Sequence, residues 1–263
     1  MTPSGIITLL TDFGTRDGYV GAMKGVVLSL FPSAVLVDLT HEIEPGDVAG
    51  AAYALATASP EYPGGTVHVA VVDPGVGTAR RSLIVETSTG ALLVGPDNGV
   101  LSLAAGRARR VFDLDRPRWF GERLSATFHG RDVFAPVAAH AASGIALEQL
   151  GTPCDAMVEL HWPAARREGD LIRGAVVHVD RFGNLITNIT RADVEALGEA
   201  RMLAVEISGR LAAFHRTFAS AEPGTLIAVL GSGDAVEVAV TEGSAAALLG
   251  VGSGTAVTVD RRP

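Results

Sequence analysis

Three apolar runs, separated by two segments with helical spacing, constrain the fold of the first third of the chain. The runs occupy residues 6–10, 34–39 and 66–72. Apolar side chains recur at helical spacing over residues 19–31, and Asp47 stands where it would cap a second helix that ends near Ser59. Strand, helix, strand, helix, strand is the pattern of parallel βαβ units. We therefore expect an α/β domain built on a mostly parallel sheet.

The third run leads into the loop that starts Asp73-Pro74-Gly75 and ends at Arg80 and Arg81. A β-branched run followed by a carboxylate, proline and glycine predicts a buried strand that opens into a tight loop. Open α/β sheets bind ligands at such strand ends. Asp73 and Arg80 would bring an acid and a cation to one crevice. The alternative is an ordinary turn followed by solvated arginines, and this stretch alone does not separate the two.

Polar residues also follow other predicted strands. Asp12 comes after the first, Asp97 and Asn98 come after a hairpin over residues 82–94, and His129 with Asp132 precedes a predicted helix over residues 133–143. Each alone suits a turn or a cap, but a shared sheet edge would make them converge. At the start of a helix, His129 would be disfavoured in its protonated form.

The second half of the chain changes character. Residues 153–172 lose periodicity and gather prolines and charges, so we expect domains over residues 1–152 and 173–263 joined by this linker. Short strands separated by turn residues follow, which predicts a small β-barrel or sandwich. Within them, residues 180–189 form either a hairpin with Gly183 at its turn or a binding segment.

Composition excludes several classes of function. A net charge of -8 argues against a nucleic-acid or anionic-membrane partner. The single Cys154 fits a reducing cytoplasm, and neither a signal peptide nor an apolar run of membrane-spanning length is present. Phosphate-loop, zinc-helix and nucleophile-elbow motifs are missing. Residues 250–254 are predicted to end a helix. They follow a helix and precede a strand, whereas a dinucleotide-binding loop follows a strand and precedes a helix.

Five motifs together resemble the S-adenosyl-L-methionine (SAM) hydroxide adenosyltransferases, which are relatives of fluorinase and chlorinase. They are residues 11–14, 73–78, 95–99, 128–132 and 182–189, in the same order through both domains. The resemblance implies a Rossmann-like N-terminal domain, a C-terminal β-barrel, and cleavage of SAM by water to adenosine and L-methionine. It further implies SAM as substrate without a cofactor or metal, and a homotrimer with the site between subunits.

Site residues follow from the same resemblance, position by position. Asp73, Arg80 and His129 match the catalytic acid, arginine and histidine, and Asp12 matches the carboxylate that holds the ribose hydroxyls. The other expected substrate-binding residues are Phe128, Asp180, Asn184 and Ser232, with Phe182 and Phe218 flanking the nucleoside. Gly231 and Gly233 stand where relatives carry Asn and halogenases carry Arg, so backbone N–H groups are expected to bind the methionine carboxylate.

In-line attack on the ribose C5′ needs a positioned water and a proton acceptor. A guanidinium at about 4 Å would favour hydroxide by roughly three pKa units, and the sulfonium would add a similar amount. Starting from about 15.7 for bulk water, this leaves a pKa near 10, so resting hydroxide is scarce. We expect attack by water oriented by Arg80, with Asp73 or His129 taking the proton.

Three alternatives stay open at this point. Asp12, Asp97, Asn98 and His129 could ligate Mg²⁺ or Mn²⁺ in a nucleotide phosphatase. The chain could instead be a SAM-dependent 5′-halogenase. It could also be a regulator that binds SAM or a nucleoside without catalysis.

Overall fold

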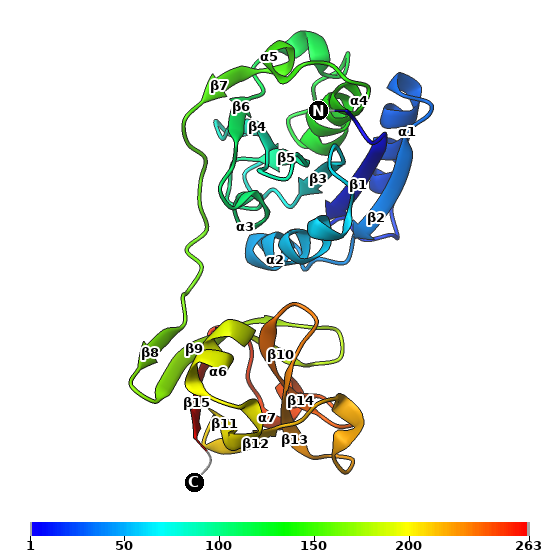
Figure 1. Cartoon of the computed structure of the whole chain (residues 1–263). Helices are drawn as coiled ribbons and strands as arrows, with labels where there is room; N and C mark the ends of the chain where they lie inside the picture. Colours follow the sequence, from blue (N-terminus) through cyan, green and yellow to red (C-terminus); the bar gives the residue numbers. More distant parts are fainter. Residues whose placement is uncertain (1, 262–263) are drawn as a thin grey trace. The chain divides into compact units, whose positions relative to one another are not determined.

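The computed structural model describes residues 2–261 and divides into two compact units between Leu160 and His161 (Figure 1). Residues 155–165, which lie within the expected linker, form neither helix nor strand. The ends of that expected linker do carry structure, because a short strand at each end joins the sheet of its own unit. Each unit is described by itself below.

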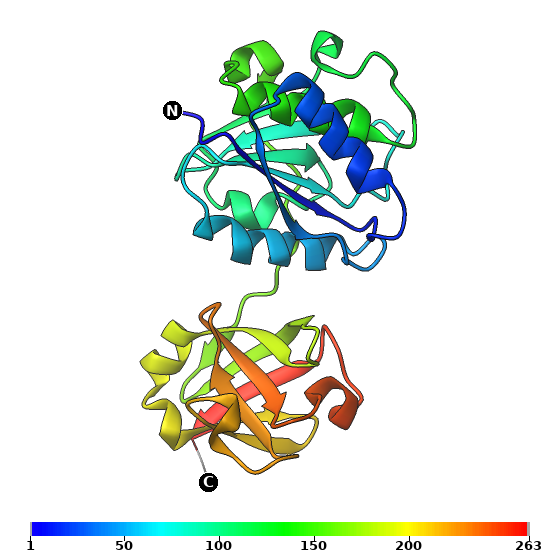
Figure 2. The same cartoon turned by 90° about the vertical axis from the view of Figure 1, so that its right-hand side faces the viewer.

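A seven-stranded sheet forms the centre of the first unit, in the order β2-β1-β3-β5-β4-β6-β7 (Figure 2). Pairings from β2 through β5 are parallel and the remaining three are antiparallel, so five of the seven strands run in one direction. The expected mostly parallel sheet is confirmed. The strands are β1 (Ile6–Thr11), β2 (Val35–Thr40), β3 (Val67–Val71), β4 (Ser82–Glu86), β5 (Leu92–Pro96), β6 (Arg110–Asp113) and β7 (Thr152–Cys154).

Helices cover both faces of this sheet. Helices α1 (Tyr19–Leu30) and α4 (Ala135–Ala142) pack on one face, and α2 (Val48–Ala58) and α3 (Ser102–Ala105) pack on the other (Figure 2). A single-turn helix, α5 (Leu147–Leu150), follows α4. Asp47 caps α2 as predicted, because its carboxylate accepts a hydrogen bond from the Gly50 N–H at 2.9 Å. Among residues 2–261, no helix is long and apolar enough to cross a membrane.

Parallel register places two of the predicted site loops side by side. Thr11, the last residue of β1, pairs with Val71, the last residue of β3. Asp12 and the loop that contains Asp73 therefore leave neighbouring strands at the same edge of the sheet. This is the edge at which ligands bind in open α/β sheets.

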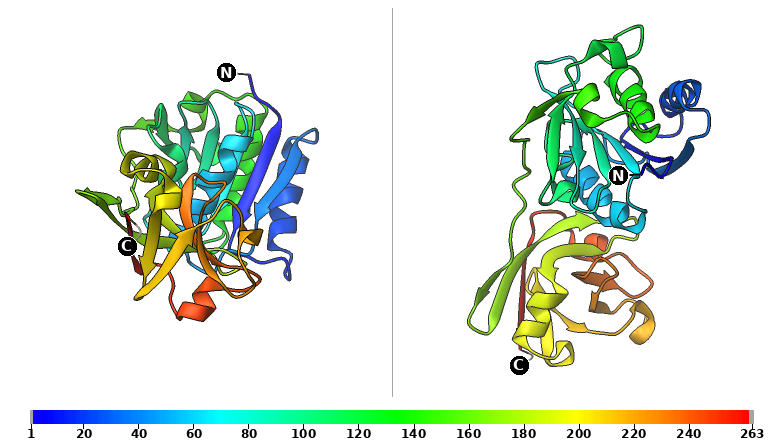
Figure 3. Two further views of the ribbon diagram at one scale, coloured as in Figure 1. Left: turned by 60° about the horizontal axis from the view of Figure 1, so that its bottom comes forward. Right: turned by 45° about the horizontal axis from the view of Figure 1, so that its top comes forward.

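The second unit is a β-barrel, shown in two further views in Figure 3. Strand β10 pairs with both β14 and β9, which closes a ring of seven strands and rules out a sandwich. The ring contains β9 (Leu171–Val179), β10 (Leu185–Thr190), β11 (Leu203–Ile207), β12 (Arg210–Phe214), β13 (Leu226–Leu230), β14 (Ala235–Val240) and β15 (Ala256–Arg261). Outside it lie β8 (Arg166–Glu168), α6 (Arg191–Leu197) and α7 (Ala245–Leu249).

Strand β12 was not predicted from the sequence. A two-residue turn at Ser208 and Gly209, both with positive φ, joins it to β11. A Ser-Gly pair between two short apolar segments is compatible with such a hairpin turn. The predicted helix stop near the C-terminus is confirmed, because Gly250 ends α7 in the left-handed conformation.

Candidate active site

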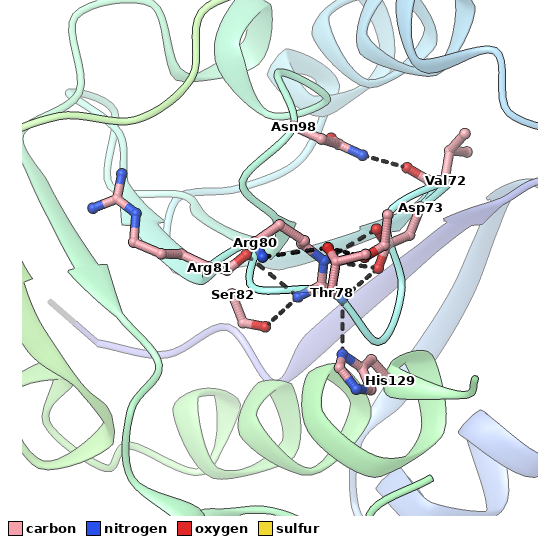
Figure 4. Close-up of polar contacts among 9 residues, drawn as sticks. Val72, Asp73, Thr78, Arg80, Arg81, Ser82, Asn98 and His129 are labelled. Atoms are coloured by element: carbon pink, nitrogen blue, oxygen red, sulfur yellow. Dashed lines mark hydrogen bonds and ion pairs between the residues drawn. The ribbon is translucent and has the colours of Figure 1, made fainter. Parts of the chain in front are cut away.

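Asp73 and Arg80 form a buried ion pair directly after β3 (Figure 4). The Arg80 Nε lies 3.0 Å from each carboxylate oxygen, and Nη2 donates a further hydrogen bond to Oδ2. Only 4% of the Asp73 side chain and 10% of the Arg80 side chain are exposed. Arg80 is therefore not a solvated surface charge.

Every N–H of the Arg80 guanidinium has a protein acceptor. Nη1 donates to the Ser82 Oγ at 2.8 Å and to the Arg81 carbonyl at 3.3 Å. Nη2 also donates to the Nδ1 of His129 at 2.8 Å (Figure 4). With the bonds to Asp73, these contacts use all five donors of the group. Arg80 thus fixes Asp73 and His129 relative to each other.

The contact with Arg80 sets the tautomer of His129. Arginine carries donors only, so Nδ1 must accept and the ring proton of the neutral imidazole lies on Nε2. Burial of His129 lowers its pKa below 6.5, and the positive charge of Arg80 lowers it further. This is the direction expected from sequence, although burial and Arg80 are its causes. His129 is therefore neutral at pH 7.

Gly77 allows the Asp73 loop and the His129 loop to touch. Its φ is +77°, and a Cβ on this residue would lie 2.4 Å from the carbonyl oxygen of Ala126. A side chain at position 77 would be strained and would push the two loops apart. His129 follows Ala126 by three residues and begins the π-turn η3 (Gly130–Phe134), which runs into α4.

A pocket of about 310 Å³ lies at this sheet edge and brings together four of the predicted residues, Asp12, Asp73, Phe128 and His129. Its remaining lining residues are Phe13, Gly46, Val71, Pro74, Val76, Thr127 and Gly130. The Oδ2 of Asp12 accepts a hydrogen bond from the Gly46 N–H at 2.9 Å. Arg80 is not part of the lining, so Asp73 and His129 present the charge and the imidazole to the pocket.

Aromatic side chains that sequence reasoning missed support Phe128. Its ring makes edge contacts with Phe13 and Tyr19, at centroid distances of 5.9 and 5.3 Å. The guanidinium of Arg131 lies 4.9 Å from the ring centroid of Phe128. The sequence pattern predicts a helix at Tyr19 and a turn at Phe13. It does not indicate that the two rings share an aromatic cluster.

The four residues proposed as metal ligands do not form one site. Asp97 binds the guanidinium of Arg81 at 2.7 Å, and Asn98 donates to the Val72 carbonyl at 2.8 Å. The Nδ1 of His129 is taken by Arg80. Throughout residues 2–261, no group of three or more His, Cys, Asp or Glu side chains is arranged to hold a metal ion. Asp97 and Arg81 instead anchor the chain at residues 156–158, through the Ala156 carbonyl and the Val158 N–H.

Three predicted barrel residues share one turn between β9 and β10. The Oδ1 of Asp180 accepts hydrogen bonds from the N–H groups of Phe182 and Asn184, at 2.9 and 2.8 Å. Its Oδ2 accepts from the Asn184 side-chain amide at 2.8 Å. The ring of Phe182 is held away from the barrel core, because 77% of that residue is exposed. The segment is thus a turn, as one of its two interpretations predicted, and it also displays an aromatic ring.

Glu237 on β14 lies beside Gly231, the residue before the predicted Ser232, and was not predicted from the sequence. A Cβ on Gly231 would lie 1.8 Å from the Glu237 carboxylate, so the glycine makes room for it. Burial raises the pKa of Glu237, and the negative charge of Asp180 adds to the effect. Phe218 lies elsewhere, in the short turn η5 (Phe218–Ser220), and is half exposed.

Comparisons with known proteins cover both units. The family model for the SAM hydroxide adenosyltransferase N-terminal domain matches residues 7–151, and the model for the C-terminal domain matches residues 174–258. An (R)-S-adenosyl-L-methionine hydrolase of Salinispora arenicola is 44% identical over 96% of this chain and 97% of its own. A fluorinase of Nocardia brasiliensis is 30% identical over 73% of this chain and 74% of its own. A solved structure of an uncharacterized conserved protein from Thermotoga maritima, 35% identical, matches with a TM-score of 0.91 over 97% of this chain and all of that one.

Proposed function

This chain belongs to the SAM hydroxide adenosyltransferase family, and we propose that it hydrolyses SAM to adenosine and L-methionine. The observation that carries the proposal is the pocket in which Asp73 and His129, both fixed by Arg80, face one space. Relatives named for hydrolysis of the (R) epimer are 42 to 44% identical, so we further propose that the sulfonium centre accepted is the (R) form.

The reaction has few requirements. The water oxygen forms a bond to C5′, the C5′–S bond breaks, and its electron pair returns to the sulfur. Methionine therefore leaves as a neutral thioether, and no acid is needed. One proton of the water must go to a base and then to solvent. The protein has to position the water in line with the sulfonium and accept that proton.

The hydrogen bonds favour Asp73 as the proton acceptor. Its carboxylate receives two N–H groups from Arg80 but offers about four lone-pair positions, so it can still accept from water. His129 has its proton on Nε2 and its Nδ1 occupied, so it suits the role of donor to the water oxygen. Arg80 has no donor left for water. Its role is to hold the two groups and to offset the negative charge of Asp73.

Substrate binding is proposed for the remaining residues. Asp12, with one oxygen anchored on the Gly46 N–H, would accept the ribose hydroxyls, and Phe128 would support the sugar from the pocket wall. In the barrel, Asp180, Asn184 and Ser232 would bind the methionine end, with backbone N–H groups receiving its carboxylate. Phe182 and Phe218 would flank the nucleoside, because both residues are exposed and their rings are free to contact it.

We also propose a homotrimer in which the active site forms between subunits, and a cytoplasmic location. The trimer rests on the family resemblance. The location is supported by the single cysteine, which suits a reducing compartment.

The direct test is to incubate the purified protein with SAM and EDTA and to measure adenosine. Each sulfonium epimer is tested separately, and we expect adenosine and methionine with a preference for the (R) form. Adenosine release abolished by EDTA and restored by Mg²⁺ or Mn²⁺ would contradict attack by water without a metal, and metal-dependent phosphate release from a nucleotide would support the phosphatase class. Binding of SAM without release of adenosine would instead support a regulator that binds SAM without catalysis.

A halide competition separates the hydrolase from the halogenase. The Asp73 carboxylate lines the pocket and would repel a bare anion. Adenosine should therefore stay the main product in high chloride or fluoride. A 5′-halogenated nucleoside as main product would overturn the assignment of water as nucleophile.

A further inference from the structure

The loop that carries Asp12 is tied at both ends to one buried histidine, His41. This residue follows β2 and is only 4% exposed. Its Nδ1 lies 2.9 Å from the Thr11 Oγ1, at the start of the loop. Its backbone carbonyl accepts a hydrogen bond from the Gly14 N–H at 2.8 Å, at the end of the loop. Asp12 and Phe13, the two residues between these ties, both line the pocket.

The side chain of His41 is itself held from the other side. Its Nε2 lies 3.0 Å from the Oδ1 of Asp38, and the Oδ2 of Asp38 accepts from Lys24 Nζ on α1 at 2.7 Å. The position of the His41 ring therefore depends on β2 and α1, which belong to the packed sheet and its covering helix.

The Thr11 hydroxyl joins the loop to the His41 ring. Its Oγ1 accepts a hydrogen bond from the Phe13 N–H at 3.2 Å, and its hydroxyl can donate to the His41 Nδ1 at 2.9 Å. The Nε2 on the other side of the ring faces the Asp38 carboxylate at 3.0 Å but lies outside hydrogen-bond geometry. The contact with Thr11 is therefore the side-chain hydrogen bond that holds the loop.

We propose that His41 is a positioning residue for substrate binding, which clamps the loop of residues 11–14 and so holds Asp12 and Phe13 at the pocket wall. This inference rests on the proposed function, in which Asp12 binds the ribose of SAM. His41 does not touch the reacting atoms. Loss of the clamp should therefore weaken binding and leave the chemical step nearly intact.

The test uses two substitutions that keep different parts of the imidazole. His41→Gln retains a donor toward Asp38 but loses the acceptor beside Thr11, whereas His41→Asn places an amide oxygen close to the Nδ1 position. We expect His41→Gln to raise the KM for SAM about 10-fold with kcat within about threefold of the parent, as for one lost buried hydrogen bond. His41→Asn should recover most of that loss.

His140 supplies a matched control. It is a half-buried histidine on α4 in edge contact with Trp119, outside the pocket lining. His140→Gln should leave KM unchanged. An equal rise of KM in both Gln variants, or a KM unchanged in folded His41→Gln, would overturn the proposal.

Hydrogen–deuterium exchange separates failure of the clamp from failure of the proposed function. The Phe13 and Gly14 amides are bonded within the clamp, so His41→Gln should speed their exchange in the protein without substrate, whatever the enzyme acts on. If wild type releases no adenosine but this exchange rises, the function fails and the clamp stands. Adenosine release with unchanged exchange would contradict the clamp alone.

Discussion

Among residues 2–261, the Asp73 carboxylate receives hydrogen bonds only from the Arg80 guanidinium, and it faces the pocket beside a histidine that the same guanidinium holds. In the proposed reaction these three side chains have different roles. Asp73 would accept a proton from water, His129 would donate a hydrogen bond to the water, and Arg80 holds the two groups relative to each other. Such fixed geometry is what a reaction with one positioned water needs.

Replacing Asp73 by Asn removes the charge and the proton-accepting capacity while keeping the size of the side chain. We expect adenosine formation to fall by about 10²- to 10⁴-fold, the range for loss of a general base, with SAM affinity retained. Turnover is measured in single-turnover experiments and affinity by calorimetry. Asp97→Asn is the matched control, because Asp97 is an equally buried acid engaged with Arg81 outside the pocket.

Two other results for Asp73→Asn are informative. A smaller loss that is partly reversed at high pH would mean that Asp73 only orients its neighbours, since hydroxide would then replace the missing base. Wild-type turnover at pH 7 with unchanged affinity would make Asp73 a turn residue.

The tautomer of His129 predicts the pH profile. Burial and Arg80 lower its pKa below 6.5, so the ring gains a proton on Nδ1 only in acid, where it loses the bond from Arg80. We expect kcat/KM to be constant around pH 7 and to fall at a pH below 6.5. His129→Asn, which can still accept from Arg80, should lose activity and also this acid limb. An acid limb that persists unchanged in the variant would assign it to another group.

At the scale of elements, strands and helices that carry the site follow from local patterns in the sequence. The elements β1, α1, β2, α2 and β3 could be predicted, because an apolar run or a helical spacing is visible within a short stretch of sequence. Convergence of Asp12 and Asp73 was predictable, since the carboxyl ends of neighbouring parallel strands share an edge. His129 precedes a helix and reaches the same pocket through the packing of its loop.

Other parts of the site depend on tertiary packing and left no local signal. Asp97 resembled a site residue, but together with Arg81 it anchors a distant segment of chain. The clamp by His41 depends on a contact between residues 30 positions apart, and the raised pKa of Glu237 depends on burial and on Asp180, which lies in another turn of the barrel. Spacing along the chain cannot distinguish such residues from ordinary polar positions.

Contact between the loops that carry Asp73 and His129 can be tested at Gly77. Gly77→Ala adds a strained φ and a Cβ 2.4 Å from the Ala126 carbonyl oxygen, so the loops must separate and His129 must shift relative to Arg80. We expect turnover to fall at least about 10-fold in a folded protein, because small misplacements at a reacting centre are costly. Gly106→Ala is the control, since Gly106 also has positive φ but has open space around its Cβ position. Equal losses of turnover in both would point to strain alone.

At the scale of the whole molecule, the two units carry different parts of the proposed site. Asp12, Asp73 and His129 belong to the α/β unit, and Asp180, Asn184 and Ser232 belong to the barrel. A trimer with shared sites would make activity depend on assembly. We expect light scattering to give three times the chain mass of 27.1 kDa at micromolar concentration. A fully active monomer would exclude the shared site.

If water held beside Asp73 attacks the ribose C5′, the new hydroxyl oxygen of adenosine comes from solvent, and oxygen isotope incorporation measures this. The enzyme is given SAM in water enriched in ¹⁸O, and adenosine and methionine are analysed by mass spectrometry. We expect one ¹⁸O in the 5′-hydroxyl of adenosine from each turnover and none in the methionine beyond a control without enzyme. Adenosine without ¹⁸O, or a product that keeps the bond between C5′ and sulfur, would contradict the account.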